Sequence, residues 1–313
     1  MSIPPDSARP VVFGEVLFDV FHGDDSVLGG APFNVAWNLQ GLGVRPLLIS
    51  CVGADARGKQ VLDAMRGWGL DTAGVQIDAD RPTGVVDVSI QDGQPEYRIL
   101  ENQAYDFIDA SEACEVSARA DTNILYHGSI GIRAAPARAA LTELKRKIDC
   151  PVFLDVNLRP PWCERDIVWA GLDGATWVKL NDEELRVVCE EGSLEEHDME
   201  AAAKKLRAQL GLEVLVVTRG DHGAFLVRKN GELLDYCQAT VVEGLIDTVG
   251  AGDAFSAVMI LGLIKGWPDA LRLKRAIEFA SFVCTLRGAT TDQAPRYQEF
   301  AQRWDRQGAG RLS

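Results

Sequence analysis

Short apolar strand signals alternate with helical segments through the middle and C-terminal parts of this chain. The predicted strands cover residues 124–127, 152–155, 176–180 and 214–218. This alternation predicts an α/β fold with a mainly parallel, doubly wound sheet, because each helix carries the chain back to begin the next parallel strand. Ligands of such sheets bind at the carboxyl ends of the strands. Polar residues that follow these strands are therefore the first candidates for a site.

The N-terminal third begins with two further strand signals. Residues 11–19 read as one buried strand whose far end turns polar, so that Glu15 and Asp19 share a face by the two-residue period. Residues 46–52 predict the next strand. Asp19 is thereby placed where a sheet exposes ligand-binding residues.

A small second sheet is predicted between residues 83 and 105. Two short alternating segments, 85–90 and 96–99, flank Asp92-Gly93, which is typical of a β-hairpin. We expect residues 18–28 to join this hairpin in a lid that excludes water from a site. The alternative is that these segments extend the main sheet.

Composition limits the classes of partner. The chain has 313 residues, 47% of them hydrophobic, which allows one large α/β domain or two smaller ones, and we expect a single domain over residues 1–313. A net charge of -14 argues against nucleic acid and anionic membranes as partners. Seven scattered cysteines without a C-x-x-C pair, and no apolar leader or spanning segment, favour the cytoplasm. The four histidines form no zinc motif.

The stretch Asp247-Thr248-Val249-Gly250-Ala251-Gly252-Asp253 joins a glycine-rich turn to a helical apolar pattern. The first amides of a helix lack internal partners and form a site for an anion such as phosphate. Asp253 would lie beside that anion and could accept a proton from an incoming hydroxyl, which indicates phosphoryl transfer. The alternative is a tight turn followed by an acid that complements the helix dipole.

A second helix opens with glycines at Gly29-Gly30-Ala31-Pro32-Phe33-Asn34 and runs to about Leu42, with Pro32 suited to the first turn. The alternative is an ordinary junction of loop and helix. Residues 53–60 imitate a phosphate-binding Walker loop, but Gln60 stands where that motif needs Ser or Thr, so we do not assign one.

Polar residues follow three of the predicted strands. At the end of the strand predicted over residues 152–155, every second residue is polar: Asp155, Asn157 and Arg159. This is a ligand-facing arrangement. Asn181 and Glu184, three apart, either cap a helix or orient water bound to Mg²⁺. Residues 218–223 contain two glycines that would leave room for a nucleotide or simply form a hairpin turn, and residues 228–231 predict another hairpin turn.

Together these motifs resemble the ribokinase-like carbohydrate kinases, the PfkB family, from Gly14 to about Pro295. Residues 29–36 look like the N-terminal signature of that family and residues 247–253 like its C-terminal one. Residues 53–58 are similar to its G-x-D-x-x-G segment, and Asn181 with Glu184 match its N-x-x-E motif. The resemblance implies an ATP-dependent kinase with a ribokinase-like three-layer α/β/α core and a β lid that often serves as a homodimer contact.

The resemblance also implies roles for individual residues. Asp253 would be the general base, and the amides of Gly250, Ala251 and Gly252 would form the anion hole. The residues implied to bind the sugar are Asp19, Gly29, Gly30, Asn34, Arg98, Asn157 and Arg159. Those implied to border ATP are Lys179, Asn181, Thr218, Gly220, Gly223, Gly250, Gly252 and residues 280–284. Asn181 and Glu184 are implied to hold Mg²⁺ through water, and Asp247 and Val249 are implied to hold K⁺. Leu286 and Asp292 occupy positions near the K⁺ site at which members of the family vary.

Within the family, residues 28–36, 155–159 and 287–290 look most like fructokinases, although many of those have Pro where Val156 stands. Fructose is therefore the expected acceptor, with 2-keto-3-deoxygluconate, ribose and nucleosides as competitors. A catalytically silent sugar-binding regulator remains an alternative. An NAD-dependent oxidoreductase is disfavoured because no G-x-G-x-x-G follows the first strand.

Overall fold

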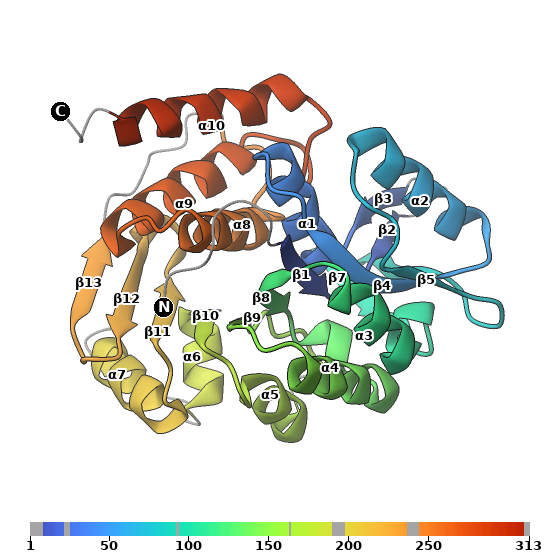
Figure 1. Cartoon of the computed structure of the whole chain (residues 1–313), viewed down its shortest axis with the longest axis horizontal. Coiled ribbons are helices and arrows are strands. Elements are labelled where there is room, and N and C mark those ends of the chain that lie inside the picture. The colour runs from blue at the N-terminus through green and yellow to red at the C-terminus, as the bar shows by residue number, and fades with distance from the viewer. Residues whose placement is uncertain are drawn as a thin grey trace.

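The computed structural model is built around a large main sheet with helices on both sides (Figure 1). The structure describes residues 9–21, 26–91, 94–162, 164–189, 198–236 and 244–309. Within them, nine strands follow the order β13-β12-β11-β10-β9-β8-β1-β4-β5. The seven strands from β11 to β5 are parallel, and β12 pairs antiparallel with both β11 and the edge strand β13. Their bounds are β1 Arg9–Phe13, β4 Leu47–Gly53, β5 Val75–Asp78, β8 Thr122–His127, β9 Val152–Asp155, β10 Trp177–Asn181, β11 Val214–Thr218, β12 Ala224–Arg228 and β13 Leu233–Tyr236.

Helices cover both faces of this sheet, which confirms the three-layer α/β/α architecture (Figure 1). One layer contains α1 Ala31–Gly41, α2 Ala56–Trp68, α8 Ala251–Ile264, α9 Asp269–Val283 and α10 Ala294–Ala309. The other contains α3 Ala110–Ala118, α4 Ala135–Lys147, α5 Arg165–Leu172, α6 Asp182–Val188 and α7 Met199–Leu210. Among these helices α8 is apolar almost all round, because the sheet, α1 and α9 enclose it. Its N-terminus is therefore held firmly by its own core packing.

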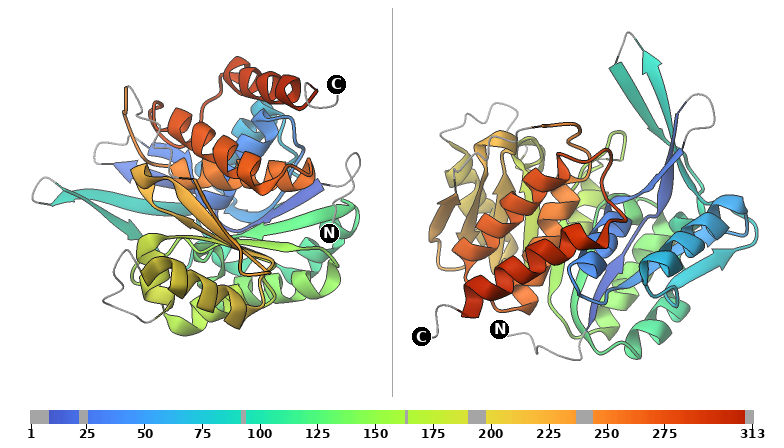
Figure 2. Two further views of the ribbon diagram at one scale, coloured as in Figure 1. Left: turned by 90° about the vertical axis from the view of Figure 1, so that its left-hand side faces the viewer. Right: turned by 90° about the horizontal axis from the view of Figure 1, so that it is seen from above.

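A four-stranded second sheet, in the order β3-β2-β6-β7, confirms the predicted small sheet. Figure 2 shows that it projects from the body of the molecule. The strands are β2 Leu17–Phe21, β3 Ser26–Gly29, β6 Gly84–Gln91 and β7 Gln94–Ile99. The predicted turn at Asp92-Gly93 and residues 22–25 of the predicted lid lie outside the described residues. The last predicted lid residues belong instead to a buried 3₁₀ turn, Ala104–Phe107.

The prediction of one strand over residues 11–19 is wrong. Strand β1 ends at Phe13, and β2 begins at Leu17 in the other sheet. Gly14 causes the break, because it adopts a φ of 144° and a Cβ atom on it would lie 2.6 Å from Pro32 Cγ. Glu15 and Asp19 therefore belong to different parts of the fold and do not share a strand face.

Most other strands agree with the sequence pattern. Strands β9 and β11 have the predicted bounds, and β4, β8 and β10 differ by one or two residues at an end. The predicted turn after β12 is closed by the Arg228 amide, which donates to Glu232 O at 2.9 Å. Among the described residues, the helices are all too short or too polar to cross a membrane.

Candidate active site

The N-terminus of α8 is open toward the carboxyl ends of the parallel strands. Gly250 is its N-cap residue with a φ of 78°, and no side chain caps this end. The Ala251 amide donates to Thr248 O at 3.3 Å, whereas the Gly252 and Asp253 amides have no acceptor among the described residues. This turn thus presents two backbone donors, which is the feature that an anion site requires.

Asp253 lies in that first turn, with its side chain buried against α1. Its Oδ2 atom accepts a hydrogen bond from Asn34 Nδ2 at 2.8 Å. The pKa of Asp253 is raised from 3.8 to about 6, mainly by burial; the charge of Asp155 contributes to this rise, while the Asn34 hydrogen bond and the charges of Lys179 and Arg159 oppose it. The carboxylate is therefore ionised at neutral pH and can act as a proton acceptor.

Asp19 and Asn34 converge on a point beside Asp253. A Cβ atom on Gly29 would lie 3.8 Å from Asp19 Oδ2 and 3.9 Å from Asn34 Oδ1, so the two oxygens face the same space. Burial raises the pKa of Asp19 to about 6, and the charge of Arg159 opposes that rise. The second sheet, α1 and α8 thus each contribute a polar group to one location.

The other residues predicted to bind sugar are placed differently. Gly30 is the N-cap residue of α1, and a Cβ atom on it would lie 2.7 Å from Glu15 O. Arg98 is exposed on β7, opposite Asp87, and nothing in the described residues brings it to Asp253. Asn157 has a φ of 42°, so the predicted alternation of Asp155, Asn157 and Arg159 on one face is wrong because the extended strand ends at Asp155.

Asp155 instead forms a buried ion pair. Lys179 Nζ donates to Asp155 Oδ1 and Oδ2, both at 2.9 Å, and Ser256 Oγ donates to Oδ2 at 2.8 Å. Burial lowers the pKa of Lys179, but Asp155, Glu184 and Asp253 outweigh this effect and leave it raised. Lys179 is therefore a permanent cation beneath the N-terminal end of α8.

Asn181 and Glu184 form a capping box at the start of α6. The Glu184 amide donates to Asn181 Oδ1 at 2.7 Å, and the Asn181 amide donates to Glu184 Oε2 at 2.8 Å. Glu184 Oε1 accepts from the Leu158 amide at 2.8 Å. The capping alternative is thus present in the structure, and each of these oxygens keeps a second lone pair that can accept a hydrogen bond.

The residues predicted to border the nucleotide lie around the turn after β11 and near α8. Thr218 ends β11, and Gly220 and Gly223 flank a 3₁₀ turn with φ values of 55° and 80°. Asp247 Oδ1 accepts from the Val249 amide at 3.0 Å, so this carboxylate is partly engaged by its own turn.

Sequence reasoning missed two features near this site. Leu245 and Ile246 are 60% and 64% exposed just before α8, which is unusual for large apolar side chains. Glu15 is 3% exposed, and its pKa is raised to about 7, mainly by burial. Backbone hydrogen bonds from Glu15 and Ala31 and the charge of Arg133 oppose this rise, whereas the charge of Asp253 contributes to it. The available signal for Glu15 was an acid directly after Gly14 within an apolar run.

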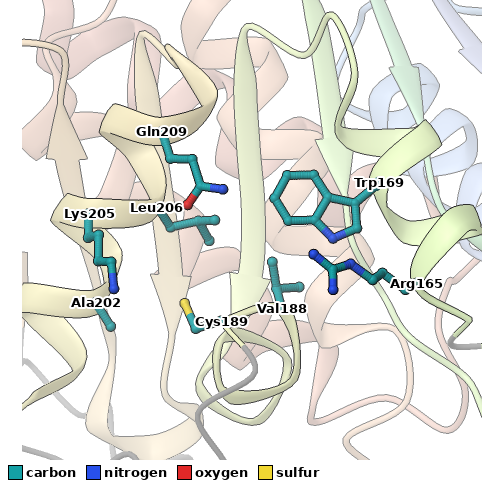
Figure 3. Close-up of a pocket in the computed structure, with 8 residues that line it drawn as sticks. All are labelled: Arg165, Trp169, Val188, Cys189, Ala202, Lys205, Leu206 and Gln209. Atoms are coloured by element: carbon teal, nitrogen blue, oxygen red, sulfur yellow. The ribbon is translucent and has the colours of Figure 1, made fainter.

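A separate cavity of about 170 Å³ lies between α5, α6 and α7 (Figure 3). Trp169, Arg165 and Leu206 line it, and none of the predicted site residues does. These helices pack on the face of the sheet opposite α8. The cavity therefore belongs to a different part of the molecule.

An open helix N-terminus and a buried carboxylate, brought together at the carboxyl ends of a parallel sheet, define an α/β enzyme that handles phosphate. Comparison with protein families gives the particular class. The model described as pfkB family carbohydrate kinase matches residues 21–296, so the chain belongs to this family of phosphotransferases and is a sugar kinase.

Relatives and solved structures agree with this membership. An uncharacterized sugar kinase of Pyrococcus horikoshii is 28% identical over 306 residues, covering 91% of this chain and 94% of the relative. Fructokinase-1 of Oryza sativa subsp. japonica is 28% identical over 270 residues, covering 81% and 80%. The crystal structure of the Pyrococcus protein with ATP has a TM-score of 0.72 at 25% identity, covering 90% and 93%. A double mutant of Vibrio cholerae fructokinase with fructose, ADP and potassium has a TM-score of 0.76 at 22% identity, covering 95% and 99%.

Proposed function

We propose that this protein transfers the γ-phosphoryl group of MgATP to a primary hydroxyl of a sugar, with fructose as the favoured acceptor. The observation that carries this proposal is the position of Asp253 in the same helical turn as two amides that have no acceptor within the described part of the chain. The hydroxyl oxygen forms a bond to the γ-phosphorus as its proton passes to Asp253. The bond from that phosphorus to the bridging oxygen breaks, and its electron pair leaves with ADP.

The sugar would lie between the second sheet and the two helix N-termini. Asp19 and Asn34 present oxygens to one space, and Arg159 lies close enough to affect the pKa of both Asp19 and Asp253. Acceptors beside a cation fit a polyhydroxylated substrate. Asn34 also fixes the carboxylate of Asp253, which supports a fixed geometry between base and hydroxyl.

The nucleotide would extend from α8 toward the turn after β11. The exposed side chains of Leu245 and Ile246 give an apolar surface suited to a base, and Thr218, Gly220 and Gly223 leave room for the ribose side. Mg²⁺ would neutralise charge on the phosphates. Asn181 and Glu184 would hold it through water, because their oxygens already accept backbone hydrogen bonds.

Activity should fall on the acid side of about pH 6. Because the pKa of Asp253 is raised to about 6, protonation below that pH removes the base. We expect kcat/KM for the sugar to fall about tenfold per pH unit below the inflection, measured by ADP release in buffers of constant ionic strength. A profile flat from pH 7 to pH 5 would remove Asp253 from the chemistry.

The acceptor is tested by measuring ADP release with fructose, 2-keto-3-deoxygluconate, ribose and adenosine, each with and without K⁺. We expect the highest kcat/KM with fructose, consistent with the similarity to rice fructokinase-1 over 81% of the chain. A higher value with another acceptor would reassign the substrate while keeping the kinase. Binding of fructose with no turnover of any acceptor would favour the silent regulator.

A further inference from the structure

The buried ion pair between Asp155 and Lys179 lies directly beneath the proposed phosphate site. The two side chains are 1% and 8% exposed; Asp155 ends β9, and Lys179 is its register partner in the neighbouring strand β10. Ser256 lies one turn after Asp253 in α8 and donates to the same carboxylate. Asp155 therefore fixes the ammonium of Lys179 and ties it to the helix that carries the proposed base.

The ammonium lies against the open turn of α8. A Cβ atom on Gly252 would lie 3.0 Å from Lys179 Nζ, closer than nearly all ordinary contacts of a Cβ atom. The amide of Gly252 has no acceptor among the described residues. Glycine at this position thus leaves room for a cation next to amides that already favour an anion.

Two of the three ammonium protons are directed at Asp155. The third has no acceptor among the residues that the structure describes, although Lys179 is only 6% exposed. A buried ammonium with an unused proton beside an anion site matches what a phosphoryl oxygen would accept.

Stability alone does not account for this pair. Removing two charges from water costs several kcal/mol per ion, and replacing a buried pair with neutral residues of similar volume is often neutral or stabilising. Two further acids, Glu184 and Asp253, lie near enough to raise the pKa of Lys179. The surroundings of Lys179 therefore keep one cation where the reaction would place negative charge.

We propose that Lys179 is a catalytic residue whose third N–H donates a hydrogen bond to the transferring phosphoryl group, and that Asp155 and Ser256 are its positioning residues. This inference rests on the proposed kinase function. No proton is transferred from the ammonium, and its charge stabilises the oxygens of the γ-phosphoryl group as the bond to ADP breaks. Asp155 sets the location of that charge through its two hydrogen bonds with the ammonium.

The test separates charge from folding. The single variants Lys179→Met and Asp155→Asn each leave one buried charge without its partner, so we expect both to lower Tm and kcat. The double variant K179M/D155N removes both charges and keeps an oxygen that can accept from Ser256. We expect it to regain most of the lost Tm but to keep kcat about 30-fold or more below wild type, with the sugar KM changed less than threefold. Recovery of both Tm and kcat would make the pair purely structural and overturn the inference.

Arg133 and Asp106 provide a matched control. They form another buried pair, 2% and 3% exposed with a 2.8 Å contact, which joins the 3₁₀ turn Ala104–Phe107 to the residue after Ile132 and contains no residue of α8, β9 or β10. The double variant R133M/D106N should likewise regain most of the Tm that the two single variants lose. Its kcat should stay within about threefold of wild type. An equal loss of kcat there would show that any buried pair gives this result, which would also overturn the inference.

Nucleotide binding gives a readout that does not need sugar turnover. In K179M/D155N we expect the Kd for the non-hydrolysable analogue AMP-PNP to rise about tenfold and the Kd for ADP to rise less than threefold, because only the former carries a γ-phosphoryl group. Equal effects on both Kd values would contradict the assignment. If wild type phosphorylates none of the four acceptors, the proposed function fails while this binding comparison still decides the role of Lys179.

If the charge variants do not fold, Gly252→Ala provides the second test. Its Cβ atom would displace the ammonium, whereas alanine is otherwise favourable in a helix. We expect G252A, which keeps both buried charges, to lower kcat, to raise the Kd for AMP-PNP about tenfold and to raise the Kd for ADP less than threefold. Equal effects on both Kd values would show that the methyl group acts on the nucleotide as a whole and not through Lys179, and would overturn the inference.

Discussion

Replacing Asp253 with asparagine is expected to lower kcat by about 10²- to 10⁴-fold, because the amide cannot accept the proton of the sugar hydroxyl. The asparagine side chain is isosteric with aspartate. Its oxygen can still accept the hydrogen bond that Asn34 Nδ2 donates to Asp253 at 2.8 Å in wild type. The sugar KM should therefore change little. The measurement is the steady-state rate of ADP release at pH 8 with saturating sugar and MgATP.

The same variant should be more stable than wild type at neutral pH. The pKa of Asp253 is raised from 3.8 to about 6, so its contribution to stability is present below pH 3.8 and is lost as pH rises through about 6. Asparagine avoids that loss, and we expect a gain on the order of 1–3 kcal/mol at pH 7 and little change at pH 4, measured by urea unfolding. Reduced activity with reduced stability at pH 7 would instead indicate a structural role.

Replacing Gly250 with alanine is expected to lower kcat about 100-fold or more. Its φ of 78° disfavours a side chain, and the new Cβ atom would lie 2.3 Å from Ala289 Cβ, so the first turn of α8 must move. Movement of about 1 Å at a site of this kind can reduce the rate about 10²-fold. The free energy of unfolding should also fall, by about 1–3 kcal/mol.

Gly266 offers a matched control for that change. It follows α8, has a φ of 65°, and a Cβ atom on it would have no neighbour within 4 Å. Gly266→Ala should therefore cost about 1 kcal/mol through backbone strain and leave kcat unchanged. If G250A keeps wild-type kcat, as G266A should, the open turn of α8 has no part in phosphoryl transfer.

Local patterns were sufficient to predict the sheet and the helix that begins at Ala251. Strands such as β9 and β11 are buried, continuous apolar runs with polar ends, which is the clearest strand pattern available in a sequence. The break at Gly14 could not be read in the same way. Apart from Glu15, the residues on either side of it are apolar, and only the close approach of Pro32 shows that the chain must leave the main sheet there.

The candidate site was predictable where a motif is contiguous and was not where it depends on tertiary contacts. Asp253 and the glycines of its turn are neighbours in sequence, so their proximity follows from one helix start. Asp155 looked ligand-facing by strand period, yet it is buried by Lys179 and Ser256, which approach it from another strand and from α8. Such pairings follow from the packing of separate elements and leave no periodic signal.

The central claim is that the open turn of α8 and Asp253 act together to move a phosphoryl group from ATP to a sugar. The most direct measurement is ³¹P NMR of wild-type protein with MgATP and fructose. We predict loss of the γ-phosphate signal with equal gain of a sugar phosphomonoester and ADP, and no such gain with D253N. Formation of inorganic phosphate in place of the phosphomonoester, or equal product formation by D253N, would contradict the account.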